Sequence, residues 1–167
     1  MNTEQKKLLK QLAQMGEVIL ITNGNRVHLN KNSAVALKTQ AHAVLYFLQR
    51  LDIDMVSSVL ENNRTYQNFE KPLFIKKLGD TLDEYIESGD TFLNRYDGVC
   101  NSKTCNFNCK GFSFVGNKSN DYMDLIIEIR EDKVFDIYEC YDFINENDTF
   151  LKKNKISIDG LESNFNQ

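Results

Sequence analysis

The sequence predicts a single α+β domain in which helices pack on an antiparallel β-meander. Apolar residues recur at three- and four-residue steps from Ser33 to Leu51 and again after Pro72, which is the spacing of a buried helix face. After Gly89 the pattern changes to the alternation of strands separated by short polar turns. The 167 residues suffice for one core without disulfide support.

Composition and charge limit the classes of partner. The chain has 41% hydrophobic and 26% charged residues, as globular proteins do, and lacks an apolar run long enough to cross a bilayer. Its first residues, Met1 to Gln14, lack the central apolar stretch of a secretory signal, so we expect a cytoplasmic protein. The formal net charge of -4 argues against binding to nucleic acid, whose phosphates require a clustered positive face. Neither nucleic acid nor a membrane is an expected partner.

The first segment of the chain is expected to form a short helix and a β-hairpin. Apolar residues with helical spacing run up to Met15. Two apolar segments, Val18 to Ile21 and Arg26 to Leu29, then flank the dipeptide Asn23-Gly24. Asn and Gly tolerate the positive φ angles of a tight turn, so this dipeptide predicts a hairpin.

Three helices and a short strand are expected next. The first helix is the long one from Ser33 to about Leu51, and Asp52 or Asp54 caps a shorter helix that follows. The aromatic segment Thr65 to Phe69 is consistent with a short strand. The only proline, Pro72, suits the first turn of a third helix, which Gly89 would end.

The second half is expected to form a meander of four strands. Polar turns at Asn101 to Asn108, Asn117 to Asn120 and Glu131-Asp132 separate them. The predicted strands are Thr91 to Cys100, Lys110 to Gly116, Asp121 to Arg130, and Lys133 to Phe143. From Asn145 on the chain is polar, and we expect a loosely attached tail with at most one edge strand around Ile156 and Ile158.

This order of elements over residues 33–143 resembles the NTF2-like superfamily. The resemblance implies a curved sheet that wraps around the helices to form a cone with a pocket, and it makes a homodimer plausible. The chain departs from the pattern in having one candidate strand where the family has two, and in the added helix and hairpin. We therefore divide it into an extension (1–31), an NTF2-like domain (32–143) and a tail (144–167). Fold analogy alone does not identify function.

Symmetric turns would set the register of the meander and hence the lining of the pocket. Leu125 would lie opposite Tyr138, and Ile127 opposite Asp136, so that Asp136 falls on the apolar, helix-facing side. A carboxylate buried there either makes structural bonds or, with a raised pKa, acts as a general acid or base, with Tyr138 beside it. The residues expected to line the pocket are Arg95, Asp97, Phe112, Phe114, Met123 and Leu125.

Three of the four cysteines lie within ten residues. If the turn between the first two meander strands is a hairpin loop, Cys100 faces Cys109 and Cys105 lies near the tip. Zinc ligation, a disulfide or redox switch, and ordinary thiols are the three alternatives. The same register places Cys140 five residues further along its strand, or about 17 Å away, too far to share a metal.

Three functions follow as hypotheses. The leading one is noncatalytic binding of a small apolar ligand or of a protein partner, in the pocket or at the edge offered by the N-terminal hairpin. The second is a small isomerase- or hydrolase-type enzyme that uses Asp136 with Tyr138, Arg95 or Asp97 for proton transfer. The third is a structural domain stabilised by zinc at Cys100, Cys105 and Cys109. No glycine-rich phosphate loop occurs, so zinc is the one cofactor considered.

Overall fold

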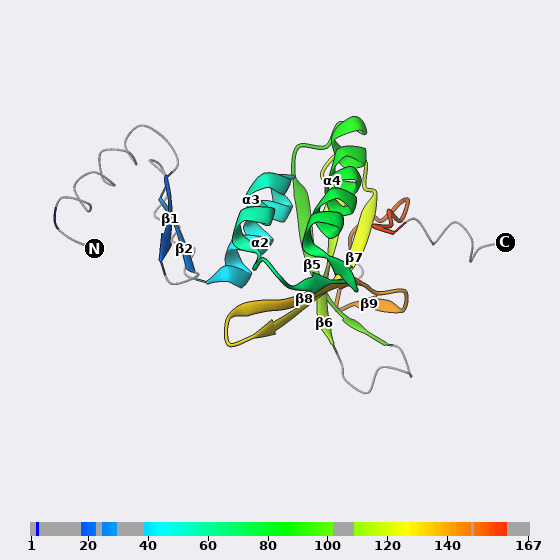
Figure 1. Cartoon of the computed structure of the whole chain (residues 1–167). Helices are drawn as coiled ribbons and strands as arrows, with labels where there is room; N and C mark the ends of the chain where they lie inside the picture. Colours follow the sequence, from blue (N-terminus) through cyan, green and yellow to red (C-terminus); the bar gives the residue numbers. More distant parts are fainter. Residues whose placement is uncertain are drawn as a thin grey trace.

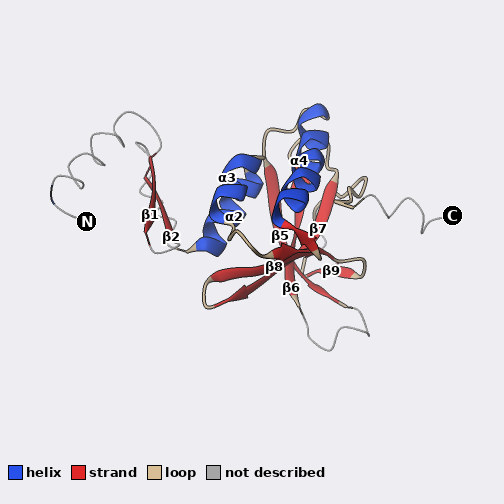
Figure 2. Cartoon of the chain, in the orientation of Figure 1, coloured by secondary structure: helices blue, strands red, loops and turns tan. Residues whose placement is uncertain are grey.

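The computed structural model describes residues 3, 18–22, 25–29, 39–101, 109–147 and 149–159. Within these ranges the chain is an α+β protein. Helices α2, α3 and α4 lie on one side of a five-stranded antiparallel sheet (Figures 1 and 2). No helix in the described ranges is both long and apolar enough to cross a membrane.

The predicted N-terminal hairpin is confirmed. Strands β1 (Val18–Thr22) and β2 (Asn25–Leu29) pair antiparallel as a separate two-stranded sheet. The turn residues Asn23-Gly24 and the helix expected before Val18 lie outside the described residues.

The first two described helices of the main body match the predicted pattern. They are α2 (Gln40–Gln49) and α3 (Ile53–Val59). The Asp52 side chain accepts a hydrogen bond from a backbone N–H in the first turn of α3, so Asp52 rather than Asp54 is the N-cap. The earlier part of the long helix predicted from Ser33 lies outside the described residues.

A small hairpin leads into the longest helix. The segment predicted as one strand is two, β3 (Thr65–Tyr66) and β4 (Phe69–Glu70), which pair with each other. The helix α4 (Lys71–Glu87) begins directly after β4 with Pro72 in its first turn. It ends before Gly89, whose φ of +92° favours glycine, as predicted.

The meander is confirmed, with one added strand. The sheet order is β8-β7-β6-β5-β9, and the strands are β5 (Leu93–Cys100), β6 (Lys110–Gly116), β7 (Tyr122–Arg130), β8 (Lys133–Glu139) and β9 (Phe143–Asn145). The prediction that the last strand runs straight to Phe143 is wrong. β8 ends at Glu139, and the chain crosses to the opposite edge, where β9 pairs with β5. On the way, Asp142 accepts a backbone hydrogen bond from Asn101.

The predicted register is confirmed between β6 and β7, where Phe112 lies opposite Leu125 and Phe114 opposite Met123. Between β7 and β8 it holds only near the turn, because a β-bulge shifts the pairing by one residue. Beyond the bulge Ile127 lies opposite Ile137 rather than opposite Asp136.

The bulge has a clear physical benefit. It leaves Phe135 as the extra residue, so that Ile137 and not Asp136 enters the core, where Ile137 is fully buried. The alternative register would bury a carboxylate in an apolar environment, which costs more than the local disruption of the ladder. The symmetric-turn argument could not anticipate this extra residue.

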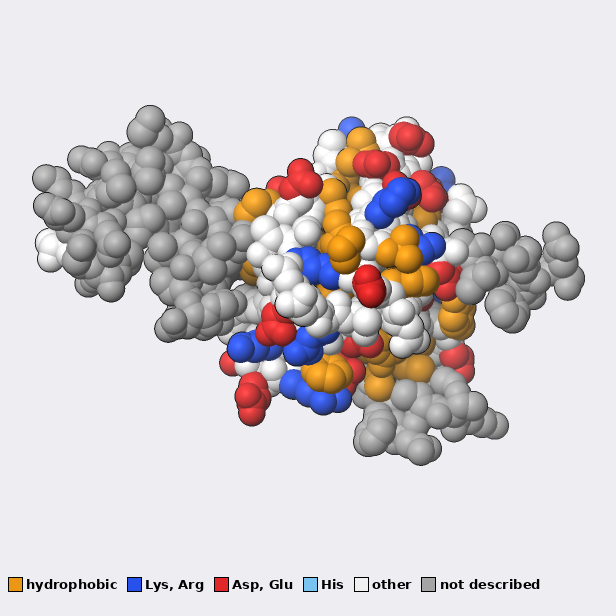
Figure 3. All heavy atoms as spheres, viewed as in Figure 1, with side chains coloured by type: hydrophobic (Ala, Val, Ile, Leu, Met, Phe, Trp, Pro, Cys, Tyr) orange, Lys and Arg blue, Asp and Glu red, His pale blue; other side chains and the backbone are white. Residues whose placement is uncertain are grey.

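One hydrophobic core lies between the helices and the sheet. It includes Leu48 from α2, Phe74 and Tyr85 from α4, and Phe114 from β6. The Tyr85 hydroxyl donates a 2.9 Å hydrogen bond to the Phe114 carbonyl, so the helix is tied to the sheet as well as packed on it. On the surface, Figure 3 shows hydrophobic side chains lying among acidic and basic ones.

The prediction of a loosely attached C-terminal tail is wrong for residues 149–159. Ile156 and Ile158 are buried in the main core, with exposed fractions of 7% and 5%. The Ile156 N–H donates to the Tyr122 carbonyl at 2.7 Å, and Lys155 forms a parallel bridge with Tyr122. Because β8 ends opposite Leu125, this segment occupies the edge of β7 that β8 leaves uncovered.

Candidate functional site

The apolar residues predicted to line a pocket belong mainly to the packed core. Phe114, Met123 and Leu125 face the helices as expected, but their side chains have no exposed surface. Phe112, further along β6, is half-buried. These side chains therefore stabilise the interior.

The two polar residues predicted for the same pocket lie on the same side of the sheet. Arg95 pairs with Phe114 and Asp97 with Phe112, and both polar side chains are exposed. The Arg95 guanidinium lies 5.1 Å from the centre of the Phe112 ring, close enough for a cation–π interaction. This pair covers an aromatic ring at the border of the core.

Asp136 is engaged by backbone donors. Its Oδ1 accepts hydrogen bonds from the Gln67 N–H at 3.0 Å and the Ile137 N–H at 2.7 Å. Partial burial raises the pKa of the Asp136 carboxyl, and these two hydrogen bonds oppose the increase. Tyr138 packs instead against the small apolar cluster of Cys100, Ile126 and Cys140. Catalysis by Asp136 and Tyr138 stays a prediction.

The contacts of Gln67 give Asp136 a structural role. The Gln67 amide accepts a hydrogen bond from the Glu139 N–H and donates one to the Glu139 carboxylate, both at 3.1 Å. With the Asp136 contact, these bonds fasten the β3–β4 turn to β8. Because β8 is an outer strand, the turn covers an edge that could otherwise pair with another chain.

The cysteine prediction is partly confirmed and partly wrong. Cys100 faces Cys109, with its N–H donating to the Cys109 carbonyl at 2.9 Å, as expected. Cys140 is not remote, because the side chains of Cys140 and Cys100 are hydrogen-bonded and share one buried cluster. The crossing of the chain after β8 brings Cys140 there. Cys105 lies outside the described residues, within which no three His, Cys, Asp or Glu side chains form a group able to hold a metal ion.

A polar cluster lies on the side of the sheet away from the helices. The Asp124 carboxylate accepts hydrogen bonds from the Ser113 hydroxyl and, at 3.2 Å, from the Lys152 ammonium. Asn145 of β9 donates to the Ser113 hydroxyl at 2.9 Å and accepts from Lys152. Every member has a partner within the cluster, so it fastens the C-terminal segment to the sheet.

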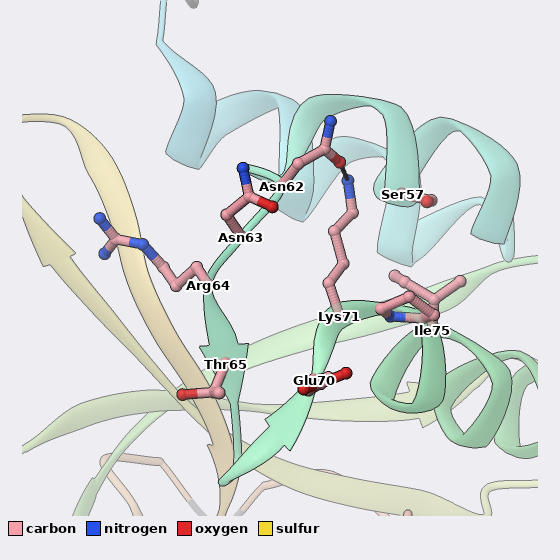
Figure 4. Close-up of a pocket in the computed structure, with 9 residues that line it drawn as sticks. Ser57, Asn62, Asn63, Arg64, Thr65, Glu70, Lys71 and Ile75 are labelled. Carbon is pink, nitrogen blue, oxygen red and sulfur yellow. Dashed lines mark hydrogen bonds between the residues drawn. The ribbon is translucent and has the colours of Figure 1, made fainter.

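A cleft that the sequence analysis missed lies at the start of α4. We call it the α3–α4 cleft, and its volume is about 820 Å³. It is shown in Figure 4, and it is lined by Ser57, Asn62, Asn63, Arg64, Thr65, Glu70, Lys71, Pro72 and Ile75. These residues come from α3, the loop before β3, the β3–β4 hairpin and the start of α4. In the sequence, the one local sign of this cleft was Lys71, which directly precedes the only proline.

Lys71 is the central cation of this cleft. The Lys71 residue is half-buried, and its ammonium donates to the Leu60 carbonyl and to the Asn62 side-chain oxygen, each at 2.8 Å. Figure 4 shows the Lys71 side chain extended toward Asn62. Burial lowers the pKa of Lys71, since removal of water disfavours the charged form. Both acceptors are neutral, so no carboxylate compensates this charge in the contacts of the described chain.

Arg64 lies at the rim and is already paired. Its guanidinium forms a 3.0 Å ion pair with Glu61 and donates to the Phe135 carbonyl at 3.2 Å. In Figure 4 the Arg64 side chain points away from Lys71. Arg64 therefore adds positive potential at the rim of the cleft, while its guanidinium is already engaged by Glu61 and Phe135.

The start of α4 adds partial positive charge to the cleft. Glu70 occupies the N-cap position, but its side chain makes no capping hydrogen bond, and the first turn carries no acidic residue. Pro72 has no N–H, and the Glu70 side chain does not accept a hydrogen bond from the other amides of the first turn. These amides and the helix dipole favour a negatively charged group at this end.

Comparisons with protein-family models, with curated proteins and with solved structures found no match for this chain.

Proposed function

We propose that this protein is a noncatalytic binding protein whose α3–α4 cleft takes a small molecule bearing a carboxylate or phosphate group. The observation that carries the proposal is the half-buried Lys71 side chain, whose ammonium is bonded to neutral acceptors alone among the described residues. A charge removed from water is costly unless it is paired, and a bound anion would supply the missing partner.

The donor count of Lys71 supports the same conclusion. An ammonium group has three N–H donors, and the Leu60 carbonyl and Asn62 side chain use two of them. The third remains for a ligand. The amides at the start of α4 would add donors from the neighbouring wall, whereas the Glu70 carboxylate at the rim would disfavour a highly charged anion.

The size and lining of the cleft favour binding over catalysis. A volume of about 820 Å³ is in the range of small-molecule sites. Its nine lining residues include neither histidine nor cysteine, and Glu70 is their one acidic member. The two hydrogen bonds described for the Lys71 ammonium go to Leu60 and Asn62 rather than to the Ser57 hydroxyl, so the described contacts give no nucleophile paired with a base. We therefore propose an anionic ligand in place of the apolar ligand expected from the sequence. The apolar side chains expected to contact that ligand are mostly buried in the core.

We infer in addition that the main body is an NTF2-like cone. The support is the arrangement of α2, α3 and α4 on one side of an antiparallel sheet, in the chain order that suggested the resemblance. The β3–β4 hairpin supplies the second short strand that the sequence appeared to lack. A homodimer, which the same resemblance suggests, stays a prediction.

Calorimetric titration of the full chain with inorganic phosphate and with succinate tests the proposed function. We expect saturable binding of at least one anion at one site per chain. Lys71→Met should weaken it about tenfold or more, the usual effect of losing a charge-assisted hydrogen bond. Lys76→Met is the matched control, because Lys76 lies on the same helix, is 71% exposed and is paired with Asp80.

Two results would contradict the proposal. One is the absence of saturable binding by either anion to a chain that is folded by circular dichroism. The other is an equal loss of affinity in Lys71→Met and Lys76→Met, which would indicate nonspecific attraction to surface charge.

A further inference from the structure

Three thiols converge on the side of the sheet away from the cleft. Cys100 ends β5, Cys109 lies opposite it just before β6, and Cys140 follows the end of β8. Cys100 and Cys140 are buried, with exposed fractions of 9% and 5%, while Cys109 is half-buried beside them. All three are present as thiols in the structure.

Cys100 and Cys140 are the two buried cysteines of this group. Their side chains are hydrogen-bonded to each other, and with Ile126 they make a small apolar cluster separate from the main core. The pair lies where the chain crosses from one edge of the sheet to the other, and Asn101 beside it donates to the Asp142 carbonyl at 2.7 Å. The crossing segment therefore holds the two side chains in one cluster.

We propose that Cys100 and Cys140 form a reversible disulfide when the protein meets a low-molecular-weight disulfide such as oxidised glutathione. The bond would link the end of β5 to the crossing segment that leads into β9. It would thereby close a loop that contains all of β6, β7 and β8. The pair is independent of the α3–α4 cleft.

The chemistry is thiol–disulfide exchange in two steps. Burial raises the pKa of the Cys140 thiol to about 12. The product is the same whichever of the two thiols reacts first. When Cys100 reacts first, its thiolate attacks one sulfur of the small disulfide, a mixed disulfide forms, and one thiolate leaves and is protonated. Cys140 then gives up its proton and attacks the Cys100 sulfur. The protein disulfide forms and the second small thiol leaves, so the two protein thiols are oxidised and the small disulfide is reduced.

The arrangement also predicts the effect on stability. A cross-link between residues distant in sequence restricts the unfolded chain more than the folded one. Since the two side chains already touch in the folded state, we expect the oxidised protein to have a higher Tm than the reduced protein. Dithiothreitol should reverse the change.

Peptide mapping tests the proposal because trypsin separates the relevant cysteines. The full chain is incubated with oxidised glutathione, alkylated at acidic pH and digested. Cys100 then lies in the peptide Tyr96 to Lys103, Cys105 and Cys109 lie in Thr104 to Lys110, and Cys140 lies in Val134 to Lys152. We expect the first and third peptides to be linked, with the loss of two hydrogen atoms.

Variants and metal analysis complete the test. Cys140→Ala should abolish both the link and the rise in Tm, whereas Cys109→Ala should retain both. The proposal is overturned if the link includes the peptide with Cys105 and Cys109, if glutathione adducts are the sole product, or if the folded chain stays reduced while the denatured chain oxidises. Zinc bound at one atom per chain, with the thiols protected, would overturn it as well.

Discussion

At the scale of single residues, buried charges in this protein depend on donors from distant segments. Asp124 is bonded to Lys152 across 28 residues, and its side chain is 6% exposed while that of Lys152 is 22% exposed. Glu139 is 8% exposed and accepts hydrogen bonds from Gln67 and from the Ile158 N–H. These bonds join the C-terminal segment to the sheet, so their loss should affect the stability of the whole fold.

Lys152→Met should lower the free energy of unfolding by about 2–3 kcal/mol, because it leaves the buried Asp124 carboxylate without its cation. Urea denaturation measures the change. Lys153→Met is the control, since that neighbour is exposed, and its substitution should change stability by less than about 0.5 kcal/mol. Equal stability of the two variants would contradict the assigned contact.

Glu139 predicts a pH dependence of stability. Burial raises the pKa of the Glu139 carboxyl above its ordinary value, although hydrogen bonds from Ile158 and Gln67 oppose the increase. A carboxyl with a raised pKa in the folded state stabilises the fold when it is protonated and loses that contribution as the pH rises through the folded pKa. The wild type should therefore lose stability relative to Glu139→Gln between about pH 4, near the ordinary Glu pKa, and pH 7.

Urea denaturation of both proteins across this pH range checks the sign. The unfolding free energy of the wild type minus that of Glu139→Gln should decrease as the pH rises. A difference that grows with pH would mean that the hydrogen bonds outweigh the burial, so that the folded pKa lies below the unfolded one.

At the scale of elements, the C-terminal segment is part of the core. Ile156→Ala should lower the free energy of unfolding by about 2–4 kcal/mol, because it removes buried methyl groups and leaves a cavity. Leu151→Ala in the same segment should cost less than about 0.5 kcal/mol, since Leu151 is 59% exposed. Similar small losses for both variants, measured by urea denaturation, would show that the segment is not packed as described.

The elements that sequence predicted well are those fixed by local chemistry. Asp52 caps α3, Gly89 ends α4, and Glu131-Asp132 adopts the positive φ angles of a tight β-turn. The bulge at Phe135 and the crossing that forms β9 depend on which side chains meet the core. No local pattern in the sequence contains that information, so the predicted positions of Asp136 and Cys140 were wrong.

At the scale of the whole molecule, the α3–α4 cleft is a product of tertiary structure. Its walls come from α3, the loop before β3, the β3–β4 hairpin and the start of α4, which the sequence pattern treats as separate elements. Predicting it would have required the relative placement of two helices and the hydrogen bonds of Lys71. The α+β class and the meander needed only the periodicity of the chain and its turns.

A titration of the ¹⁵N-labelled full chain with inorganic phosphate, followed by NMR, tests the proposed site most directly. The account predicts saturable shifts of the backbone amide signals of Asn62, Lys71 and Leu73, and loss of these shifts in Lys71→Met. Shifts centred on Lys152 and Lys153 instead, or no saturable shift at the α3–α4 cleft, would contradict it.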